Sequence, residues 1–202
     1  MKIAALTGAG VSKASGVPTF VEMGNLRDKL SRQYFNDYPF EFYKILNEMR
    51  VVTESANPNP AHESLAKYHV PIVTMNIDGL HHKAGSVEND VIEIHGSLRK
   101  VFCPSCSKWF DFSVTKNSIY CTQCKNVILE PDIVLYGDHI PKLYNAIEMV
   151  SKVDLLLVIG TSFYTSTATY VSEAAKRQGV EVKIINDNAE EEVPNLLREY
   201  LK

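Results

Sequence analysis

Short apolar runs recur along the chain, and most of them end in glycine or in small polar residues. They are rich in aliphatic residues and predict strands at 3–6, 70–74, 91–94, 131–137, 153–159 and 182–185. Runs without alternation are typical of parallel strands that are covered on both faces. Apolar residues at helical spacing lie between them, in 21–50, after Pro60, around 143–150 and over 167–178. This alternation predicts an α/β fold with a parallel sheet.

Small and polar residues gather where the predicted strands end. In chain order these ends carry Gly8-Ala9-Gly10, Asn76-Ile77-Asp78, His95-Gly96, Gly160-Thr161-Ser162 and Asn186. Open α/β sheets bind ligands at the carboxyl ends of their strands, and in a parallel sheet these ends share one rim. We therefore expect a ligand site there, although Asn76 and Asp78 are also ordinary turn formers when each is taken alone.

The first of these turns is rich in glycine and favours a nucleotide. Gly8 and Gly10 let the backbone turn sharply, and free N–H groups at a following helix start suit a phosphate. Ser12 and Ser15 are candidate caps for the helix that follows, and the alternative to a nucleotide site is a plain strand-to-helix turn. The usual dinucleotide fingerprint has a third glycine where Lys13 stands, and an acidic residue about 20 positions later at a strand end. Because the chain lacks both, it is not expected to bind a nucleotide as dehydrogenases do.

Among the six histidines, one stands at a strand end before a glycine. That residue is His95, and an imidazole with an ordinary pKa near ~6.5 is a candidate general base. A lone histidine is more often structural, so the assignment depends on its neighbours. His62, in the helix that starts at Pro60, has no candidate partner nearby in the sequence and is interpreted as structural.

Four cysteines define a separate module at 99–131. They form two C-x2-C pairs with 14 residues between them: Cys103, Cys106, Cys121 and Cys124. Each pair presents two thiolates to one ion, and two pairs complete a tetrahedron, so we expect structural zinc without an open coordination position. Two disulfides are the alternative. The module also has basic and aromatic residues, which can bind single-stranded nucleic acid, but we interpret the aromatic residues as its core.

Composition narrows the functional classes. The chain has 202 residues and a formal charge of −3, which argues against bulk electrostatic binding to nucleic acid or to an anionic membrane. No apolar stretch approaches the roughly 20 residues that span a bilayer. The amino terminus has no secretory signal pattern, so a cytoplasmic protein is expected.

Taken together, these motifs resemble the sirtuins, the NAD-dependent protein-lysine deacylases. The resemblance covers most of the chain in the family's motif order. It rests on Gly8-Ala9-Gly10-Val11-Ser12 with residues 15–20, on Thr74 to Leu80, on His95-Gly96, on the cysteine pairs, on Tyr136-Gly137-Asp138, on Gly160-Thr161-Ser162 and on Ile185-Asn186. It implies a Rossmann-like NAD-binding domain at 1–20, 51–98 and 132–202, and a small domain at 21–50 and 99–131. NAD would be consumed as a co-substrate, with acylated lysine of proteins as the partner.

The resemblance also implies residue roles. In the family the acyl-lysine oxygen attacks the nicotinamide ribose, a histidine acts as base on a ribose hydroxyl, and the acyl group ends on ADP-ribose. The implied catalytic residues are His95, Asn76 and Asp78. The implied NAD-binding residues are Gly8, Ala9, Gly10, Ser12, Phe20, Asn76, Ile77, Asp78, Gly160, Thr161, Ser162 and Asn186. Phe20, Val134, Tyr136 and Gly137 are the implied acyl-lysine contacts.

The chain departs from the family pattern at two NAD-facing positions. Val21 stands where the family has arginine, and Met75 stands where it has glutamine. Two alternatives therefore stay open: an ADP-ribosyltransferase or NAD-cleaving enzyme on the same site, and a non-catalytic module that binds NAD or nucleic acid. Family members that remove acidic acyl groups carry tyrosine and, three residues later, arginine. Tyr43 is followed by Leu46 here, so acidic acyl groups are not expected as substrates.

Overall fold

A five-stranded parallel sheet is the centre of the computed structural model, which describes residues 1–19, 22, 24–26, 28–162 and 166–201. Its spatial order is β3-β2-β1-β7-β8. The strands are β1 (Ile3–Thr7), β2 (Ile72–Thr74), β3 (Val91–Glu93), β7 (Leu155–Ile159) and β8 (Glu181–Ile185). Thr7 pairs with Thr74 and Ile159, Thr74 pairs with Glu93, and Ile159 pairs with Ile185. The last residues of all five strands are therefore level, and this register forms the predicted rim.

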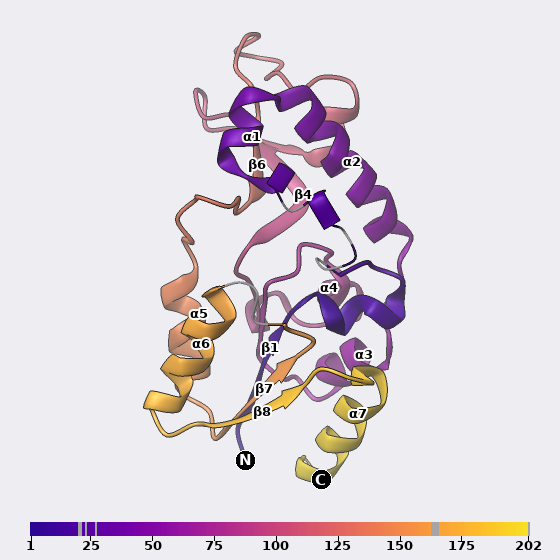
Figure 1. Cartoon of the computed structure of the whole chain (residues 1–202), viewed down its shortest axis with the longest axis vertical. Coiled ribbons are helices and arrows are strands. Elements are labelled where there is room, and N and C mark those ends of the chain that lie inside the picture. The colour runs from indigo at the N-terminus through magenta and orange to yellow at the C-terminus, as the bar shows by residue number, and fades with distance from the viewer. Residues whose placement is uncertain (20–21, 23, 27, 163–165, 202) are drawn as a thin grey trace.

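Helices cover both faces of this sheet (Figure 1). On one face lie α3 (Pro60–Lys67) and α7 (Ala189–Tyr200), which share an aliphatic cluster with β1 and β7. On the other face lie α5 (Leu143–Val150) and α6 (Ser166–Arg177). All residues of β1 and β7 are buried between these layers, which explains their unbroken apolar sequence. The Rossmann-like fold class is thereby confirmed.

The first turn differs from its prediction. A 3-10 helix, η1 (Ala9–Ser15), starts directly after Gly8, and no side chain caps it. Neither Ser12 nor Ser15 is a helix cap, because both lie within η1. The helix that starts at Pro60 does form, and the Asn59 side chain accepts a hydrogen bond from the Ala61 N–H at its start.

A second sheet of three antiparallel strands, in the order β5-β4-β6, belongs to the other end of the molecule. Its strands are β4 (Gly96–Phe102), β5 (Trp109–Asp111) and β6 (Glu130–Ile133), with η5 (Phe112–Lys116) after β5. The run at 131–137 was expected in the parallel sheet, and that expectation is wrong: β6 pairs with β4. Alternate residues of β6 are buried, as in a strand covered on one face, and Pro131 has no N–H for a central parallel ladder.

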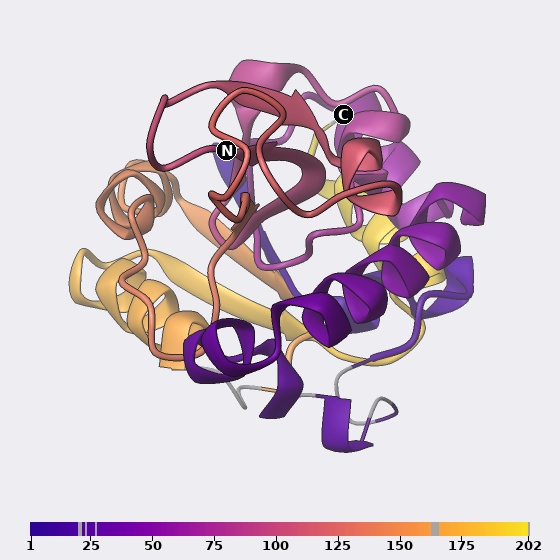
Figure 2. The same ribbon diagram turned by 90° about the horizontal axis from the view of Figure 1, so that it is seen from above.

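Two helices from earlier in the chain pack on this second sheet. They are α1 (Arg32–Asp37) and α2 (Pro39–Ser55), and Figure 2 shows them along one side of the loops that follow β4. The remaining elements are short: η2 (Gly24–Leu26), η3 (Asp28–Leu30), α4 (Leu80–Lys83) and η4 (Glu88–Asp90). Across the described ranges, no helix combines the length and the apolar character that crossing a membrane requires.

Candidate active site at the strand ends

A cavity of about 620 Å³ lies between the rim of the parallel sheet and the second sheet. Eight of the predicted site residues line it: Ala9, Asn76, Ile77, Asp78, His95, Val134, Tyr136 and Gly137. Leu26, Leu30 and Met49 form an apolar wall beside them. Of the other described site residues, Gly8, Gly10, Ser12, Gly160, Thr161, Ser162 and Asn186 lie at the rim outside its lining. Phe20 and Val21 lie outside the described residues.

Glycine is required at positions 8 and 10 for a structural reason that the sequence alone did not reveal. The Gly10 N–H donates to the Gly160 carbonyl at 2.8 Å, so the turns after β1 and β7 are in contact. A Cβ on Gly10 would lie 2.7 Å from Gly160 Cα, and one on Gly8 would lie 2.8 Å from Gly160 O. Gly160 itself has φ +62, which disfavours any side chain. These glycines bring two strand ends together, whatever they also do for a ligand.

Ser12, Asn76 and Asp78 form one hydrogen-bonded cluster. The Ser12 hydroxyl donates to Asp78 Oδ2 at 2.7 Å, and Asn76 Nδ2 donates to Ser12 Oγ at 3.1 Å and to Asp78 Oδ2 at 3.2 Å. Asp78 Oδ1 accepts from the Leu80 N–H at 2.9 Å, which fixes the carboxylate at the start of α4. Asn76 is 8% exposed, so these polar groups are held at the inner edge of the cavity.

His62 lies behind this cluster. Its side chain is fully buried, its Nδ1 accepts from the Asn59 N–H at 3.4 Å, and its Nε2 is 3.4 Å from Ser12 Oγ. Because Nδ1 accepts, the proton of the neutral ring is on Nε2, which donates to Ser12. Burial lowers the pKa of His62, while the charge of Asp78 opposes that shift. The structural interpretation accounts for Nδ1, but Nε2 joins His62 to the predicted site.

His95 lines the cavity, and its hydrogen bonds define which ring nitrogen carries the proton. Its Nδ1 is 3.1 Å from the Met75 carbonyl, which can only accept, so Nδ1 carries the proton of the neutral ring. Its Nε2 is 3.1 Å from Thr167 Oγ1, and its lone pair accepts from that hydroxyl. Burial lowers the pKa of His95, and the bond to Met75 partly offsets this. The ring is therefore neutral at pH 7, with a basic nitrogen at the cavity wall.

The segment after β6 is fixed to His95 through the backbone. The Val134 N–H donates to the His95 carbonyl at 2.9 Å. Gly96 has φ +77, and a Cβ there would lie 2.0 Å from the Asp132 carbonyl oxygen. Only glycine fits at position 96, between His95 and the segment after β6. The predicted base, His95, and the predicted acyl-lysine contact Val134 therefore lie side by side.

The ends of β7 and β8 meet at the other side of the rim. Asn186 Oδ1 accepts from the Thr161 N–H at 3.1 Å. Thr161 is buried, whereas Ser162 and Asn186 are exposed and face solvent with polar groups. Hydroxyls and amides of this kind suit the phosphates and sugar of a nucleotide.

Sequence reasoning missed Thr167 and Leu30. Thr167 is only 3% exposed and contacts the predicted base from 72 positions away. Leu30 reaches the cavity from η3. Both look like ordinary helical residues in the sequence, and no local signal distinguishes them.

Tyr43 and Leu46 occupy the positions where family members that remove acidic acyl groups carry tyrosine and arginine. Both are buried in the core between α2 and the second sheet, and the Tyr43 hydroxyl donates to the Leu129 carbonyl. Neither residue occurs in the described cavity lining, and neither offers a cation for an acidic acyl group. A different residue of α2, Glu48, does line it.

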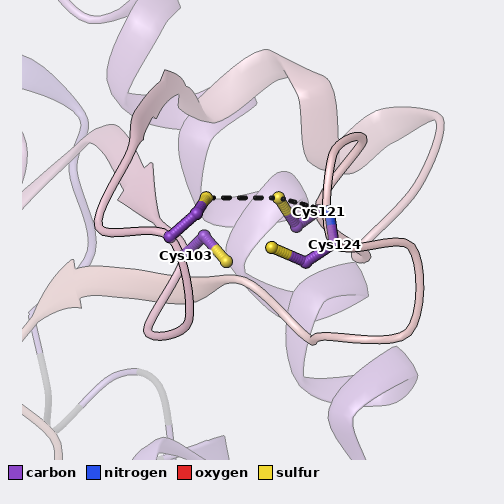
Figure 3. Close-up of side chains that lie close together, drawn as sticks. Cys103, Cys121 and Cys124 are labelled. Atoms are coloured by element: carbon purple, nitrogen blue, oxygen red, sulfur yellow. Dashed lines mark hydrogen bonds between the residues drawn. The ribbon is translucent and has the colours of Figure 1, made fainter.

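The four cysteines form a site suited to a metal ion. All four are free thiols, and their sulfur atoms lie within 4.8 Å of one another (Figure 3). Cys106 Sγ and Cys121 Sγ are 3.9 Å apart, close to the ~3.8 Å edge of a tetrahedron with Zn–S bonds of about 2.3 Å. Four thiolates leave no open position, so the predicted set fits structural zinc and not catalytic zinc.

The fold and the site define a class of protein. It is an α/β protein whose parallel sheet has helices on both faces, with polar residues suited to a nucleotide at the strand ends and a four-cysteine metal module. Comparison with known proteins identifies the family. The Sir2 family model matches residues 8–166. An NAD-dependent protein deacetylase of Bacillus cereus is 37% identical over 202 residues, covering 92% of this chain and 81% of the relative. The chain belongs to the Sir2 family, and its resemblance to sirtuins is confirmed.

Solved structures agree with this assignment. A Sir2 homologue in complex with NAD has a TM-score of 0.87 at 29% identity, covering 98% of this chain and 88% of that chain. Sir2Tm bound to a propionylated peptide also has a TM-score of 0.87, at 28% identity, covering 98% and 92%.

Proposed function

We propose that this chain is an NAD-dependent protein-lysine deacylase, most specifically a deacetylase, that transfers the acyl group to ADP-ribose and releases nicotinamide. One observation carries the proposal: His95, with its basic Nε2, lines the same cavity as the Asn76–Asp78 pair and the apolar residues Val134 and Tyr136. Names of relatives and neighbouring structures support it, since they include a deacetylase, an NAD complex and an acylated peptide.

The residues at the rim fit NAD through the chemistry of their donors. Ala9, Ser12, Thr161, Ser162 and Asn186, with the glycines at 8, 10 and 160, would hold the phosphates and adenosine, and Phe20 is assigned the role of covering the reaction centre. Asn76, Ile77 and Asp78 would hold the nicotinamide and its ribose. When bound, NAD supplies a ribose carbon activated by the nicotinamide leaving group. The domain division into 1–20, 51–98 and 132–202 and into 21–50 and 99–131 is part of this proposal.

Each side chain then has a defined task. Asp78 would accept from an amide N–H of nicotinamide, while its second oxygen stays fixed by the Leu80 N–H. His95 Nε2 would take a proton from a ribose hydroxyl, and the Met75 carbonyl would stabilise the resulting imidazolium through Nδ1–H. Val134, Tyr136 and Gly137 enclose the acyl-lysine chain and exclude water that would compete for the reacting carbon.

We further propose that neutral acyl groups are preferred and that the protein is cytoplasmic. Glu48 lines the cavity, and its carboxylate repels an acyl chain that ends in a carboxylate. The four thiols are free, and zinc ligation requires reduced cysteines, as in a reducing compartment.

The test measures nicotinamide and acylated ADP-ribose with NAD and an acetyl-lysine peptide. His95→Ala should lower peptide-dependent kcat/KM by about 10²–10⁴-fold, since it removes a general base. The matched control is His139→Ala, which replaces an exposed histidine. In the wild-type protein, kcat/KM should fall as the pH is lowered through the depressed pKa of His95, because protonation removes the base.

The alternatives predict different products. Peptide-independent nicotinamide release, or transfer of label from NAD to protein, would indicate ADP-ribosyl transfer or NAD cleavage. This alternative is motivated by Val21 and by Met75, whose side chain is 7% exposed and packs in the apolar core. Nucleotide binding with no nicotinamide release in any assay would indicate a non-catalytic module.

A further inference from the structure

Arg32, the first residue of α1, contacts three groups with one guanidinium. Its Nε and Nη2 donate to Oδ1 and Oδ2 of Asp138, each at 2.9 Å, and its Nη1 donates to Glu130 Oε2 at 2.7 Å. The Phe35 ring lies below the guanidinium, with its centroid 5.1 Å from Cζ. A forked contact with one carboxylate and a second carboxylate on the remaining nitrogen fixes the position and the orientation of this side chain.

The backbone around Arg32 contacts the same segment. The Tyr136 N–H donates to the Leu30 carbonyl, and the Arg32 N–H donates to the Tyr136 carbonyl, both at 3.0 Å. Asp138 Oδ2 also accepts from the Leu135 N–H at 3.1 Å, so the carboxylate held by Arg32 closes the turn at 135–138. The side chain and the main chain of Arg32 therefore both contact the short segment at 135–138.

That segment and the described chain before Arg32 form adjoining walls of the cavity. Leu26 and Leu30 line one wall, and Val134, Tyr136 and Gly137 line the other. Arg32 lies where the two walls are hydrogen-bonded to each other, and its own side chain is absent from the described lining. The side chains of Arg32, Glu130 and Asp138 are 33%, 23% and 19% exposed, so solvent screens their attraction only in part.

The titration of Asp138 agrees with this geometry. Burial alone would raise the pKa of Asp138, but the hydrogen bonds from Arg32 and from the Leu135 N–H lower it below its usual value. The carboxylate is therefore ionised, and the fork to Arg32 is intact at neutral pH.

We propose that Arg32 is a positioning residue for the acyl-lysine: through Asp138 it fixes the wall at 134–137 beside the wall formed by Leu26 and Leu30, and so sets the affinity for the acylated substrate. The inference rests on the proposed function, because it takes this cavity as the acyl-lysine site. Arg32 does not take part in the chemistry at His95, and its effect is expected on substrate binding and not on the reaction step.

The experiment compares Arg32→Ala with the wild-type protein in peptide titrations at saturating NAD and in NAD titrations at saturating peptide. Arg32→Ala removes the fork to Asp138 and the pair with Glu130, and a loss in substrate binding equivalent to one charge-assisted hydrogen bond should raise the KM of the acetyl-lysine peptide about tenfold. The KM of NAD should stay within error. Arg32→Lys should give an intermediate peptide KM, because an ammonium cannot form the fork. Asp138→Asn should also raise the peptide KM, and the double variant should be no worse than Arg32→Ala.

Arg50 offers a matched control. It pairs with Glu54 at 2.5 Å and Asp111 at 3.5 Å, and its guanidinium lies 5.5 Å from the Phe112 ring centroid. It thus joins α2 to the second sheet much as Arg32 joins α1 to it, but the described lining of the cavity contains none of its partners. Arg50→Ala should leave the peptide KM unchanged.

The outcomes separate this inference from the function on which it rests. If the wild-type protein turns over but Arg32→Ala keeps its peptide KM, or Arg50→Ala raises it equally, the inference is wrong. Should Arg32→Ala fail to fold, the peptide KM of Arg32→Lys and Asp138→Asn decides in the same way. If the wild-type protein shows no NAD-dependent turnover, the proposed function fails instead. In that case fluorescence anisotropy of a labelled acetyl-lysine peptide tests Arg32 directly, with about tenfold weaker binding expected in Arg32→Ala and equal binding contradicting its role.

Discussion

The five strands of the parallel sheet pack between aliphatic side chains, whereas the small sheet packs on aromatic rings and beside four cysteines. In the first region Leu6, Leu156 and Val158 are fully buried between two layers of helices. In the second, Phe35, Phe42 and Tyr43 make edge-on ring contacts, and Phe112 lies beside Tyr43. The large region is stabilised by apolar burial, while the small one combines an aromatic core with a four-thiol metal module.

The difference explains where the site lies. The parallel sheet provides a rigid and level rim with His95, Asn76 and Asp78, and the small region provides the opposing cavity wall. Such a wall depends on a metal module and on a few polar contacts such as that of Arg32. The two regions should therefore respond to different perturbations.

The largest expected effect is that of metal loss on the small region. Binding of structural zinc to small modules is worth about 10–16 kcal/mol, and it is coupled to folding. Cys121→Ser, or a strong chelator, should unfold the small region and leave the parallel sheet folded. Trp109 is the only tryptophan of the chain and lies on β5, so its fluorescence reports this region alone.

Ser105→Ala is the control for that experiment, since Ser105 is an exposed residue of the same four-cysteine module, between Cys103 and Cys106. It should keep the zinc content and the Trp109 emission of the wild-type protein. Loss of far-UV circular dichroism together with the Trp109 signal would show that the parallel sheet also depends on the metal, and that the two regions are not stabilised separately.

A smaller effect, on the other region, is expected for Gly10→Ala. The new Cβ would meet the backbone of Gly160 at 2.7 Å, and neither turn can move without breaking a strand end. Overpacking of this kind costs about 3 kcal/mol, at the upper end of its usual range. Urea unfolding followed by far-UV circular dichroism should shift to lower urea, with little change in Trp109 fluorescence.

Gly179→Ala is the control for Gly10→Ala. It distinguishes the cost of a steric clash from the cost of placing a side chain on a left-handed backbone. Gly179 has φ +80 but no atom within 4 Å of its added Cβ, so only the left-handed backbone is strained, at about 1–2 kcal/mol. If Gly10→Ala shifts both probes equally, the two regions unfold as one unit.

How far the sequence predicts this structure depends on whether a feature is local. The strand ends with Asn76, Asp78 and His95 were predictable, because unbroken apolar runs indicate parallel strands, and parallel strands share a rim. The four-cysteine module was predictable from spacing alone. The role of Gly10 was only half predicted: its glycine character is visible, but its partner Gly160 lies in a distant part of the chain.

Features set by tertiary pairing were not predictable. The apolar run at 131–137 has no signal that distinguishes the two sheets, apart from Pro131. Thr167 and Leu30 reach the cavity because of how α6 and η3 pack, and Tyr43 faces the core instead of the cavity for the same reason. At such positions, the spacing of apolar residues shows which face of a helix is buried. It does not show which other element packs against that face.

A further effect, at most similar in size to that of Gly10→Ala, concerns a charge within the parallel sheet. Glu93, the last residue of β3, has a side chain that is 7% exposed and lies against the Arg99 guanidinium, with which it forms an ion pair when it is ionised. Burial raises its pKa to about 7 from the usual 4.5, although the charge of Arg99 opposes this. The groups that face it are His82, Arg99, Lys142, Glu88 and Asp132.

Between pH 4.5 and about 7, Glu93 keeps its proton in the folded protein, whereas the unfolded chain loses it, so stability falls as the pH rises through this window. Glu93→Gln removes that cost and should raise the free energy of unfolding by up to roughly 3 kcal/mol at pH 8, and by little at pH 4.5. Urea unfolding at both pH values measures this, with Glu88→Gln, an exposed carboxylate beside the same His82, as the control. If Glu93→Gln destabilises the protein at pH 8, the ion pair with Arg99 outweighs burial, and even the apolar sheet depends on a specific polar contact.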